Sequence, residues 1–160
     1  MAFPPFSSYD PRANKLELYH PTGSGTRGLT SKEFSGGAIV HLLTKRLQDL
    51  PNKDFSLVEI SFSSDDLVSS FTKAHNGKAP EIVRYSEEDY QRDMNKDFLS
   101  AMGAARIKSL VEGTEWPGEV ISDFDGWEKK DLEHYVRECM EASPPELLRS
   151  RVAELTKPKK

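Results

Sequence analysis

The sequence predicts an α+β fold that is rich in helices and contains only a few short strands. Five segments carry apolar residues at helical spacing, and three of them follow a serine or threonine that can cap a helix. Three short runs show the alternation or clustering of apolar residues that is typical of strands. The regular succession of apolar strands that a complete doubly wound sheet requires is missing from the sequence.

The length and composition of the chain indicate one globular domain. Its 160 residues can form a substantial core but are few for two domains. With 36% hydrophobic and 30% charged residues, the composition fits a soluble protein. We expect an irregular lead-in over residues 1–14, a single domain over residues 15–156 and a basic tail over residues 157–160.

Charge and hydropathy argue against nucleic-acid and membrane partners. The net charge is −4, and basic residues gather without acids only in the final TKPKK, whereas a nucleic-acid binder normally has a concentrated basic face. No apolar run approaches the roughly 20 residues that span a bilayer, and residues 1–12 lack the features of a signal peptide. Cys139 is the sole cysteine, so no intrachain disulfide can form. The sequence therefore predicts a cytoplasmic protein.

The first predicted elements surround a glycine-rich connection. Residues 15–20, KLELYH, alternate apolar and polar side chains as a half-buried strand does. Thr30 or Ser31 can then cap a helix that ends before Pro51. The apolar stripe of this helix consists of Phe34, Ala38, Ile39, Leu42, Leu43, Leu47 and Leu50.

The middle of the chain shows the most consistent local signals. Residues 55–61, FSLVEIS, are predicted to form one strand. Ser63 or Ser64 caps the following helix, and acids at positions 65–66 suit its first turn because the helix dipole is positive there. Gly77 stands where a left-handed residue commonly ends a helix.

The last part of the chain is predicted to be mainly helical. EIVRY, residues 81–85, forms a short strand, and Ser86 with Asp89 resembles a capping box that opens a third helix. Apolar residues continue that helix to Leu110, with a break expected at Gly103. The final two helices are predicted from the apolar residues Leu132, Tyr135, Val136, Cys139, Leu147, Leu148, Val152 and Leu155.

Gly23, Gly25 and Gly28 match the G-x-G-x-x-G pattern of dinucleotide-binding loops. In such loops the glycines permit a tight turn after a buried strand, and the phosphates lie at the N-terminus of the next helix. Here the preceding strand alternates polar and apolar residues, three residues separate it from the first glycine, and the helix caps come after the last glycine. Asp49 stands about 20 positions on, where the motif expects an acid, but in a helix tail and not at a strand end. We therefore interpret residues 23–28 as a flexible connection.

The remaining chemically active residues favour structural roles. No histidine has a partner at metal-ligand spacing, so no metal site is predicted. The acids at positions 65–66 and 87–89 follow serine caps, which favours helix capping over a calcium site. Cys139 falls on an apolar helical stripe, and we expect it to be a buried, inert thiol. The four histidines are His20, His41, His75 and His134.

The aromatic loop at residues 116–127 is the candidate ligand site. Trp116, Phe124 and Trp127 can line a substrate pocket, since small-molecule sites are mostly apolar with a few polar groups. The alternative is that these large side chains fix the loop to the core. On the first interpretation, the partner of this chain is a small organic molecule.

Three stretches carry a resemblance to a known family: SKEFSGGAIVHLLTK, NKDFSLVEISFSSDDLVSSFTKAHNGKAPEIVRYSEEDY and GWEKKDLEHYV. They resemble the C-terminal part of NmrA-like proteins, the isoflavone-reductase-related branch of the atypical short-chain dehydrogenases. In that family a first helix helps to close the cofactor domain. A strand, a capped helix, a short strand and an acid-rich helix start then follow, and a Gly-Trp pair like Gly126–Trp127 precedes the last helix.

The resemblance implies a substrate-side lobe without a complete Rossmann domain. The family's nucleotide fingerprint, G-x-x-G-x-x-G, and its catalytic lysine belong to the N-terminal half, and neither has a counterpart here. The chain then starts near the point where the cofactor domain ends. No cofactor is expected to bind to this chain alone, although NADP is possible by resemblance, and catalytic and cofactor-binding residues remain unknown.

Three functions remain open from the sequence. The chain can be an NmrA-like, oxidoreductase-related lobe that depends on another chain for NAD(P). It can be a non-catalytic regulatory module, because the family includes redox-sensing regulators, or an accessory protein that binds a small molecule. Whether it is an enzyme stays open; if so, the resemblance implies an NAD(P)-dependent oxidoreductase that is not catalytic in isolation. A lobe of this kind should expose an apolar face, to be covered by a second copy or by a partner chain.

Overall fold

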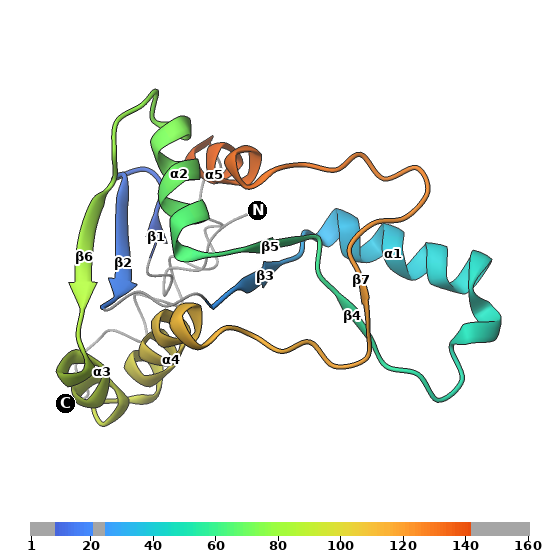
Figure 1. Cartoon of the computed structure of the whole chain (residues 1–160), viewed down its shortest axis with the longest axis horizontal. Helices are drawn as coiled ribbons and strands as arrows, with labels where there is room; N and C mark the ends of the chain where they lie inside the picture. Colours follow the sequence, from blue (N-terminus) through green and yellow to red (C-terminus); the bar gives the residue numbers. More distant parts are fainter. Residues whose placement is uncertain (1–8, 21–24, 142–160) are drawn as a thin grey trace, which may run out of the picture.

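The computed structural model describes residues 9–20 and 25–141 and shows a mixed α+β fold (Figure 1). Five α-helices and three small sheets lie within these residues. We call the three-stranded sheet with α2, α3, α4 and α5 the body, and α1 with β4 and β7 the arm; β3 and β5 connect the two (Figure 1). Among the described helices, none combines the length and the apolar character needed to cross a membrane.

The sheet of the body consists of β1 (Tyr9–Asp10), β2 (Lys15–Tyr19) and β6 (Glu81–Tyr85), with β2 in the centre. β1 is antiparallel to β2, whereas β6 is parallel to it. The alternation in KLELY buries Leu16 and Leu18, as the sequence predicts. β1 lies in the segment that the sequence predicts to be irregular. The sequence pattern misses this strand because two residues have no periodicity of their own, and β1 is defined only by its pairing with β2.

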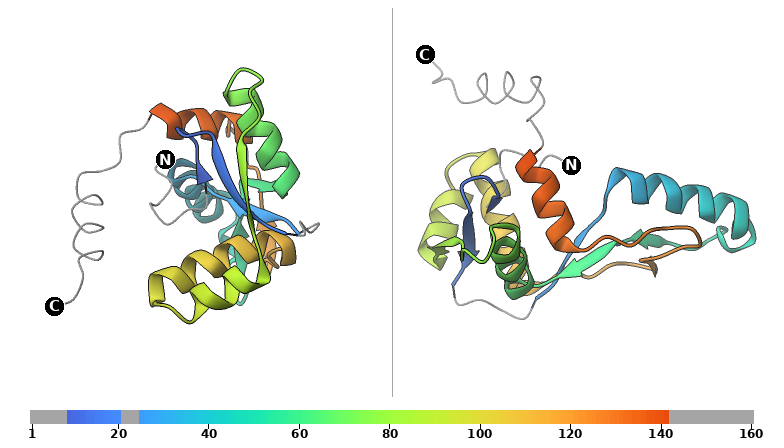
Figure 2. Two further views of the ribbon diagram at one scale, coloured as in Figure 1. Left: turned by 90° about the vertical axis from the view of Figure 1, so that its left-hand side faces the viewer. Right: turned by 90° about the horizontal axis from the view of Figure 1, so that it is seen from above.

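The helices of the body pack around this sheet in two groups. α2 (Ser64–Ala74) and α5 (Leu132–Glu141) share one apolar cluster with Leu16 and Leu18. α3 (Glu87–Met94) and α4 (Phe98–Glu112) pack around Tyr19 and Tyr85, at the carboxyl end of β2 and β6 (Figures 1 and 2). The central sheet therefore has α2 and α5 along its length and α3 and α4 at one end.

Local capping signals predict most helix starts correctly. Ser63 with Asp66 and Ser86 with Asp89 form capping boxes, in which each serine hydroxyl and each aspartate accept a backbone N–H. The expected break at Gly103 is wrong. The helix is interrupted earlier, between Met94 and Phe98, because Asp97 accepts the N–H of Ser100 at 2.9 Å and starts α4 anew. Gly103 lies inside α4.

The strand predicted over residues 55–61 is two strands in different sheets. β4 (Phe55–Leu57) pairs in parallel with β7 (Glu119–Ile121), whereas β5 (Ile60–Phe62) pairs antiparallel with β3 (Arg27–Leu29). Val58 and Glu59 are buried at the change of partner. The single-strand prediction fails because the partners of the two halves come from opposite parts of the chain.

The arm is built on α1 (Lys32–Lys45), followed by the 3₁₀ turn η1 (Leu47–Asp49). Ser31 caps α1 by accepting the N–H of Phe34 at 3.0 Å. The buried side chains of α1 are Phe34, Ala38 and Leu42, which pack on Ile121 of β7. We call the side chains of Ile39, Val40, Leu43 and Leu47 the outer face of the arm; they are 50%, 59%, 52% and 58% exposed.

The apolar stripe identified in the sequence is therefore buried only in part, since Ile39, Leu43 and Leu47 are exposed. α1 is apolar on both sides, and the strands of the arm cover only one of them. The helix predicted over residues 147–155 and the basic tail lie outside the described residues.

Candidate functional site

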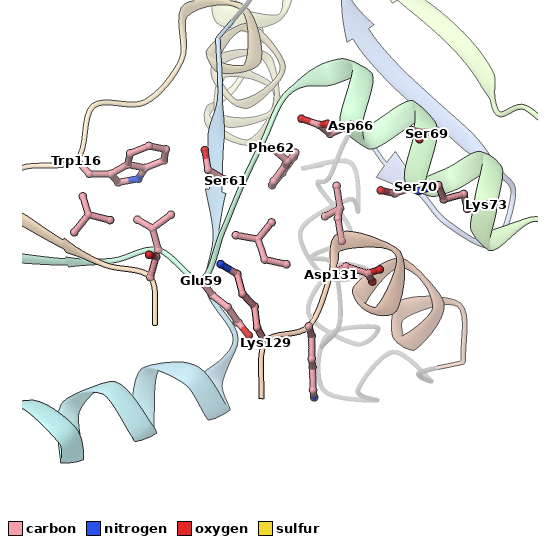
Figure 3. A pocket seen from close by; sticks show the side chains of 16 residues that line it. Glu59, Ser61, Phe62, Asp66, Ser69, Ser70, Lys73, Trp116, Lys129 and Asp131 are labelled. Carbon is pink, nitrogen blue, oxygen red and sulfur yellow. The ribbon is translucent and has the colours of Figure 1, made fainter. Parts of the chain in front are cut away.

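A cavity of about 840 Å³ lies where the body meets the arm (Figure 3). Its walls come from β5 and the two residues before it, from α2, from the loop at Trp116, from β7 and Ser122, and from the segment that leads into α5. The volume falls within the range of roughly 300–1,000 Å³ that is usual for small-molecule sites. The lining combines apolar side chains with serines, lysines and carboxylates.

α2 contributes one helical face to the cavity. Asp66, Ser69, Ser70 and Lys73 follow the i, i+3, i+4, i+7 spacing that aligns side chains on one side of a helix. Asp66 is occupied in the capping box, where it accepts the Ser63 N–H at 2.8 Å and the Ser63 hydroxyl at 2.7 Å. These hydrogen bonds lower the pKa of Asp66, so it stays ionised as a structural group.

Glu59 is the buried carboxylate of the site. Only 1% of the residue is exposed, and its two oxygens accept hydrogen bonds from the Ser31 N–H, at 2.9 Å, and from the Tyr135 hydroxyl. Burial, and then the hydrogen bond to Glu59, raise the pKa of Tyr135 to about 12. Glu59 thus joins the start of α1, the entry to β5 and the middle of α5.

The sequence pattern predicts no functional role for Glu59. The signal that could have identified it is a carboxylate inside the apolar run FSLVEIS, since a buried acid needs specific hydrogen-bond donors. Those donors come from residues 28 and 76 positions away in the sequence, so spacing alone could not assign them.

Trp116 forms an apolar wall of the cavity and packs on Gly28 of β3. A Cβ atom at Gly28 would lie 3.1 Å from Trp116 Cζ2 and 3.1 Å from Val58 Cγ1. The absence of a side chain at position 28 therefore lets the indole ring approach the strand. This packing explains why position 28 is a glycine without any role in nucleotide binding.

The other described glycine of the motif lies beside the C-terminus of α4. A Cβ atom at Gly113, which caps α4, would lie 3.3 Å from Gly25 Cα, and Thr114 donates its N–H to the Thr26 carbonyl at 2.9 Å. A helix C-terminus carries a negative partial charge, whereas phosphates bind at helix N-termini. The expectation of a plain flexible connection is wrong in one respect, because Gly28 is part of a paired strand. Gly23 lies outside the described residues.

Phe124 and Trp127 lie apart from Trp116, in the cluster beneath α1. Their rings contact Phe34, with centroid distances of 5.4 Å and 5.3 Å. A Cβ atom at Gly37 would lie 2.5 Å from Phe124 Cζ, so the loop fits closely against α1. Of the three aromatic residues predicted to line a pocket, the structure places Trp116 in the cavity and the other two where they hold the loop to the arm.

The segment before α5 brings two lysines to the cavity. Asp131 accepts the His134 N–H at 2.8 Å at the start of α5, and the Lys130 ammonium lies 5.9 Å from the centre of the Tyr135 ring. Figure 3 shows the Lys129 side chain beside Glu59, between Trp116 on one side and α2 on the other. No described carboxylate forms an ion pair with Lys73 or Lys129.

The histidines and the cysteine are dispersed. His41 packs on Phe124, His134 packs on Tyr135, and a ring nitrogen of His75 lies 2.6 Å from the Pro11 carbonyl oxygen. Cys139 is buried. Within residues 9–20 and 25–141, no three histidine, cysteine or acidic side chains gather as metal ligands would.

No relative of this chain was found among known proteins. Neither the family models nor the curated proteins nor the solved structures compared with this chain include a match. The resemblance to NmrA-like proteins therefore rests on the sequence patterns alone.

Proposed function

We propose that this chain is the substrate-side lobe of an NmrA-like, oxidoreductase-related protein and that it binds a small organic molecule in the cavity. In this proposal the NAD(P) site is supplied from outside the 160 residues, and the chain acts in the cytoplasm. The observation that carries the proposal is the cavity itself, whose volume of about 840 Å³ and mixed lining suit such a ligand.

The outer face of the arm supports the role of a lobe. Ile39, Val40 and Leu43 are each at least half exposed on one helix. Contiguous apolar surface of this kind is typical of protein interfaces. A second domain or subunit that covers α1 would bury it, as the proposed arrangement requires.

A non-catalytic binding or regulatory protein is the second candidate function. Each carboxylate of the cavity accepts hydrogen bonds from the protein: Asp66 and Asp131 each use one oxygen at the start of a helix, and Glu59 accepts a buried hydrogen bond on both oxygens. The described residues of the cavity thus offer groups that bind a ligand, while its carboxylates already take part in structural hydrogen bonds. This favours binding as the contribution of the isolated chain.

Thermal unfolding with added ligands tests the proposal. A ligand at 100 times its Kd stabilises the folded state by about 2.7 kcal/mol, so a panel of small organic molecules should contain compounds that raise the Tm. NADP⁺ and NADPH alone should leave the Tm unchanged.

Two matched variants locate the binding. Trp116→Ala should abolish the ligand-induced rise in Tm, whereas Trp127→Ala removes the same ring outside the cavity and should retain the rise. A rise in Tm with NADP⁺ alone would contradict the proposal of an external cofactor site. A ligand-induced rise that Trp116→Ala leaves intact would contradict the cavity as the binding site.

A further inference from the structure

We propose that the ligand of the cavity is an organic anion, a carboxylic acid with an apolar or aromatic body, whose carboxylate binds to Lys129 while its body packs on Trp116. This inference rests on the proposed function, because it names the ligand class of the same site. It follows from the charges of the lining, from the position of Lys129 and from the character of the opposite wall.

The lining holds three carboxylates and three ammonium groups, and each carboxylate accepts at least one hydrogen bond from the protein. Asp66 accepts two hydrogen bonds from Ser63, and Asp131 accepts the His134 N–H. Glu59 accepts hydrogen bonds on both oxygens. The Ser31 N–H that binds it belongs to the N-terminus of α1, where the positive end of the helix dipole offsets its charge.

The ammonium groups remain available to a ligand. Lys73 and Lys129 form no ion pair with a described carboxylate, and Lys130 lies over the Tyr135 ring. Lys129 occupies the middle of the cavity, whereas Lys73 lies toward the end of α2 (Figure 3). A negatively charged group bound in the middle of the cavity would therefore lie nearer to Lys129 than to Lys73.

The wall near Lys129 suits the uncharged body of such a ligand. Trp116 presents an indole ring that its packing on Gly28 holds in place, and the apolar side chains of Ile60 and Val120 also line the cavity. Ser61 and Ser122 add neutral hydroxyl groups. An inorganic anion would leave these apolar surfaces in contact with water, whereas an aryl or alkyl group would cover them.

A single central ammonium matches a singly charged carboxylate better than a phosphate. At the two helices that border the cavity, α2 and α5, Ser63 accepts the Asp66 N–H and Asp131 accepts the His134 N–H, so one amide of each first turn is already paired. No arginine is among the residues that line the cavity, which lacks the forked donor that phosphates commonly use.

Tryptophan fluorescence tests the inference directly. In the Trp127→Phe background, emission from Trp116 reports on the cavity, because the chain has two tryptophans. The Trp127 indole nitrogen donates no hydrogen bond to a described residue, so this replacement loses no such bond. The probes are two acid–alcohol pairs, 4-phenylbutyrate with 4-phenylbutan-1-ol and octanoate with octan-1-ol.

The acids should bind at least tenfold more tightly than their alcohols, since a charge-assisted hydrogen bond is lost with the carboxylate. Lys129→Gln should remove this preference without weakening alcohol binding, and Lys129→Arg should restore it. Lys53→Gln, at an exposed lysine outside the cavity, should leave the preference unchanged. A circular dichroism melt of each variant confirms that it folds.

The outcomes separate this inference from the proposed function. If acids and alcohols bind equally, or if Lys129→Gln keeps the preference, the anion inference is overturned while the cavity remains a ligand site. If none of the four probes alters Trp116 emission at millimolar concentration, the cavity accepts no small organic molecule and both proposals fail.

Discussion

α1 in the arm and α2 in the body begin alike and end in different environments. Each is capped by a serine and carries apolar residues at helical spacing. α2 buries Leu67 and Phe71 completely, between the central sheet and α5. α1 buries Phe34 completely but leaves Leu43 52% exposed, because the arm has strands on only one side of the helix. Similar local signals thus specify a helix in both regions, while the number of neighbouring elements decides how much of it is buried.

The candidate site lies between the two regions. The cavity takes one wall from α2 of the body and another from β7 of the arm, and Glu59, which also lines it, is hydrogen-bonded to both regions. The cavity is thus bordered by the closed core of the body on one side and by the partly open arm on the other.

The largest difference in the free energy of unfolding is expected between the variants Phe71→Ala in α2 and Leu43→Ala in α1. Phe71→Ala should lower the free energy of unfolding by about 3–5 kcal/mol, because it leaves a cavity in a closed core. Leu43→Ala should change it by less than about 0.5 kcal/mol, because the side chain is on the outer face of the arm. Urea denaturation measures both. A large cost for Leu43→Ala, together with elution of the wild-type chain as a dimer, would show that a second copy covers the arm.

Loss of the hydrogen bond between Tyr135 and Glu59, which joins the body to the arm, should lower the free energy of unfolding by a somewhat smaller amount. Tyr135→Phe removes the hydroxyl that donates to Glu59 and leaves a buried carboxylate oxygen without this donor. We expect a loss of about 1–3 kcal/mol in the free energy of unfolding, measured by urea denaturation. Tyr90→Phe is the matched control, since no described hydrogen bond involves its hydroxyl. Equal effects of the two variants would contradict the structural role of the hydrogen bond to Glu59.

Two adjacent glycines in α1 distinguish the inner and outer sides of the arm. Gly36→Ala should stabilise the protein by up to about 1 kcal/mol, because alanine favours the helix and no atom lies within 4 Å of the new Cβ. Gly37→Ala has the same helical benefit, but its Cβ would lie 2.5 Å from Phe124 Cζ. Displacement of that ring should cost about 1–3 kcal/mol. Thermal melts of the two variants should therefore shift in opposite directions, and a rise in Tm for both would contradict the close fit of Phe124.

The smallest effect concerns acid sensitivity of the body. The pKa of Glu87 is lowered to about 2, first by the hydrogen bond from Gln91 and then by those from Tyr19 and Lys108. Since this value lies below the ordinary 4.5, ionised Glu87 stabilises the folded state above about pH 4.5, and that contribution is lost as the pH falls toward 2. Glu87→Gln should reduce the acid-dependent loss of stability, measured as the urea midpoint between pH 5 and pH 2.

Glu88→Gln provides the control for this titration. Glu88 is the adjacent exposed carboxylate on α3, and no described side chain forms an ion pair with it. An identical pH profile for the two variants would mean that the contacts of Glu87 do not contribute to stability.

The candidate site could be predicted only in part. The loop at residues 116–127 was identified from its aromatic residues, and Trp116 does line the cavity. Phe124 and Trp127 have similar side chains in the same loop, yet they pack beneath α1. Side-chain type indicates that a residue will be buried, whereas the path of the loop determines which space it fills.

The sequence by itself determined the mixed α+β class and, to within one residue, where three helices begin: at Thr30 or Ser31, at Ser63 or Ser64, and at Ser86. These features depend on contacts within about one helical turn, so neighbouring residues suffice to specify them. Only the tertiary structure decided that residues 55–62 divide between two sheets, that one side of α1 stays uncovered and that the buried Glu59 lines a cavity. Those features depend on which distant segments come to lie side by side, and the pattern of a single segment carries no record of its partners.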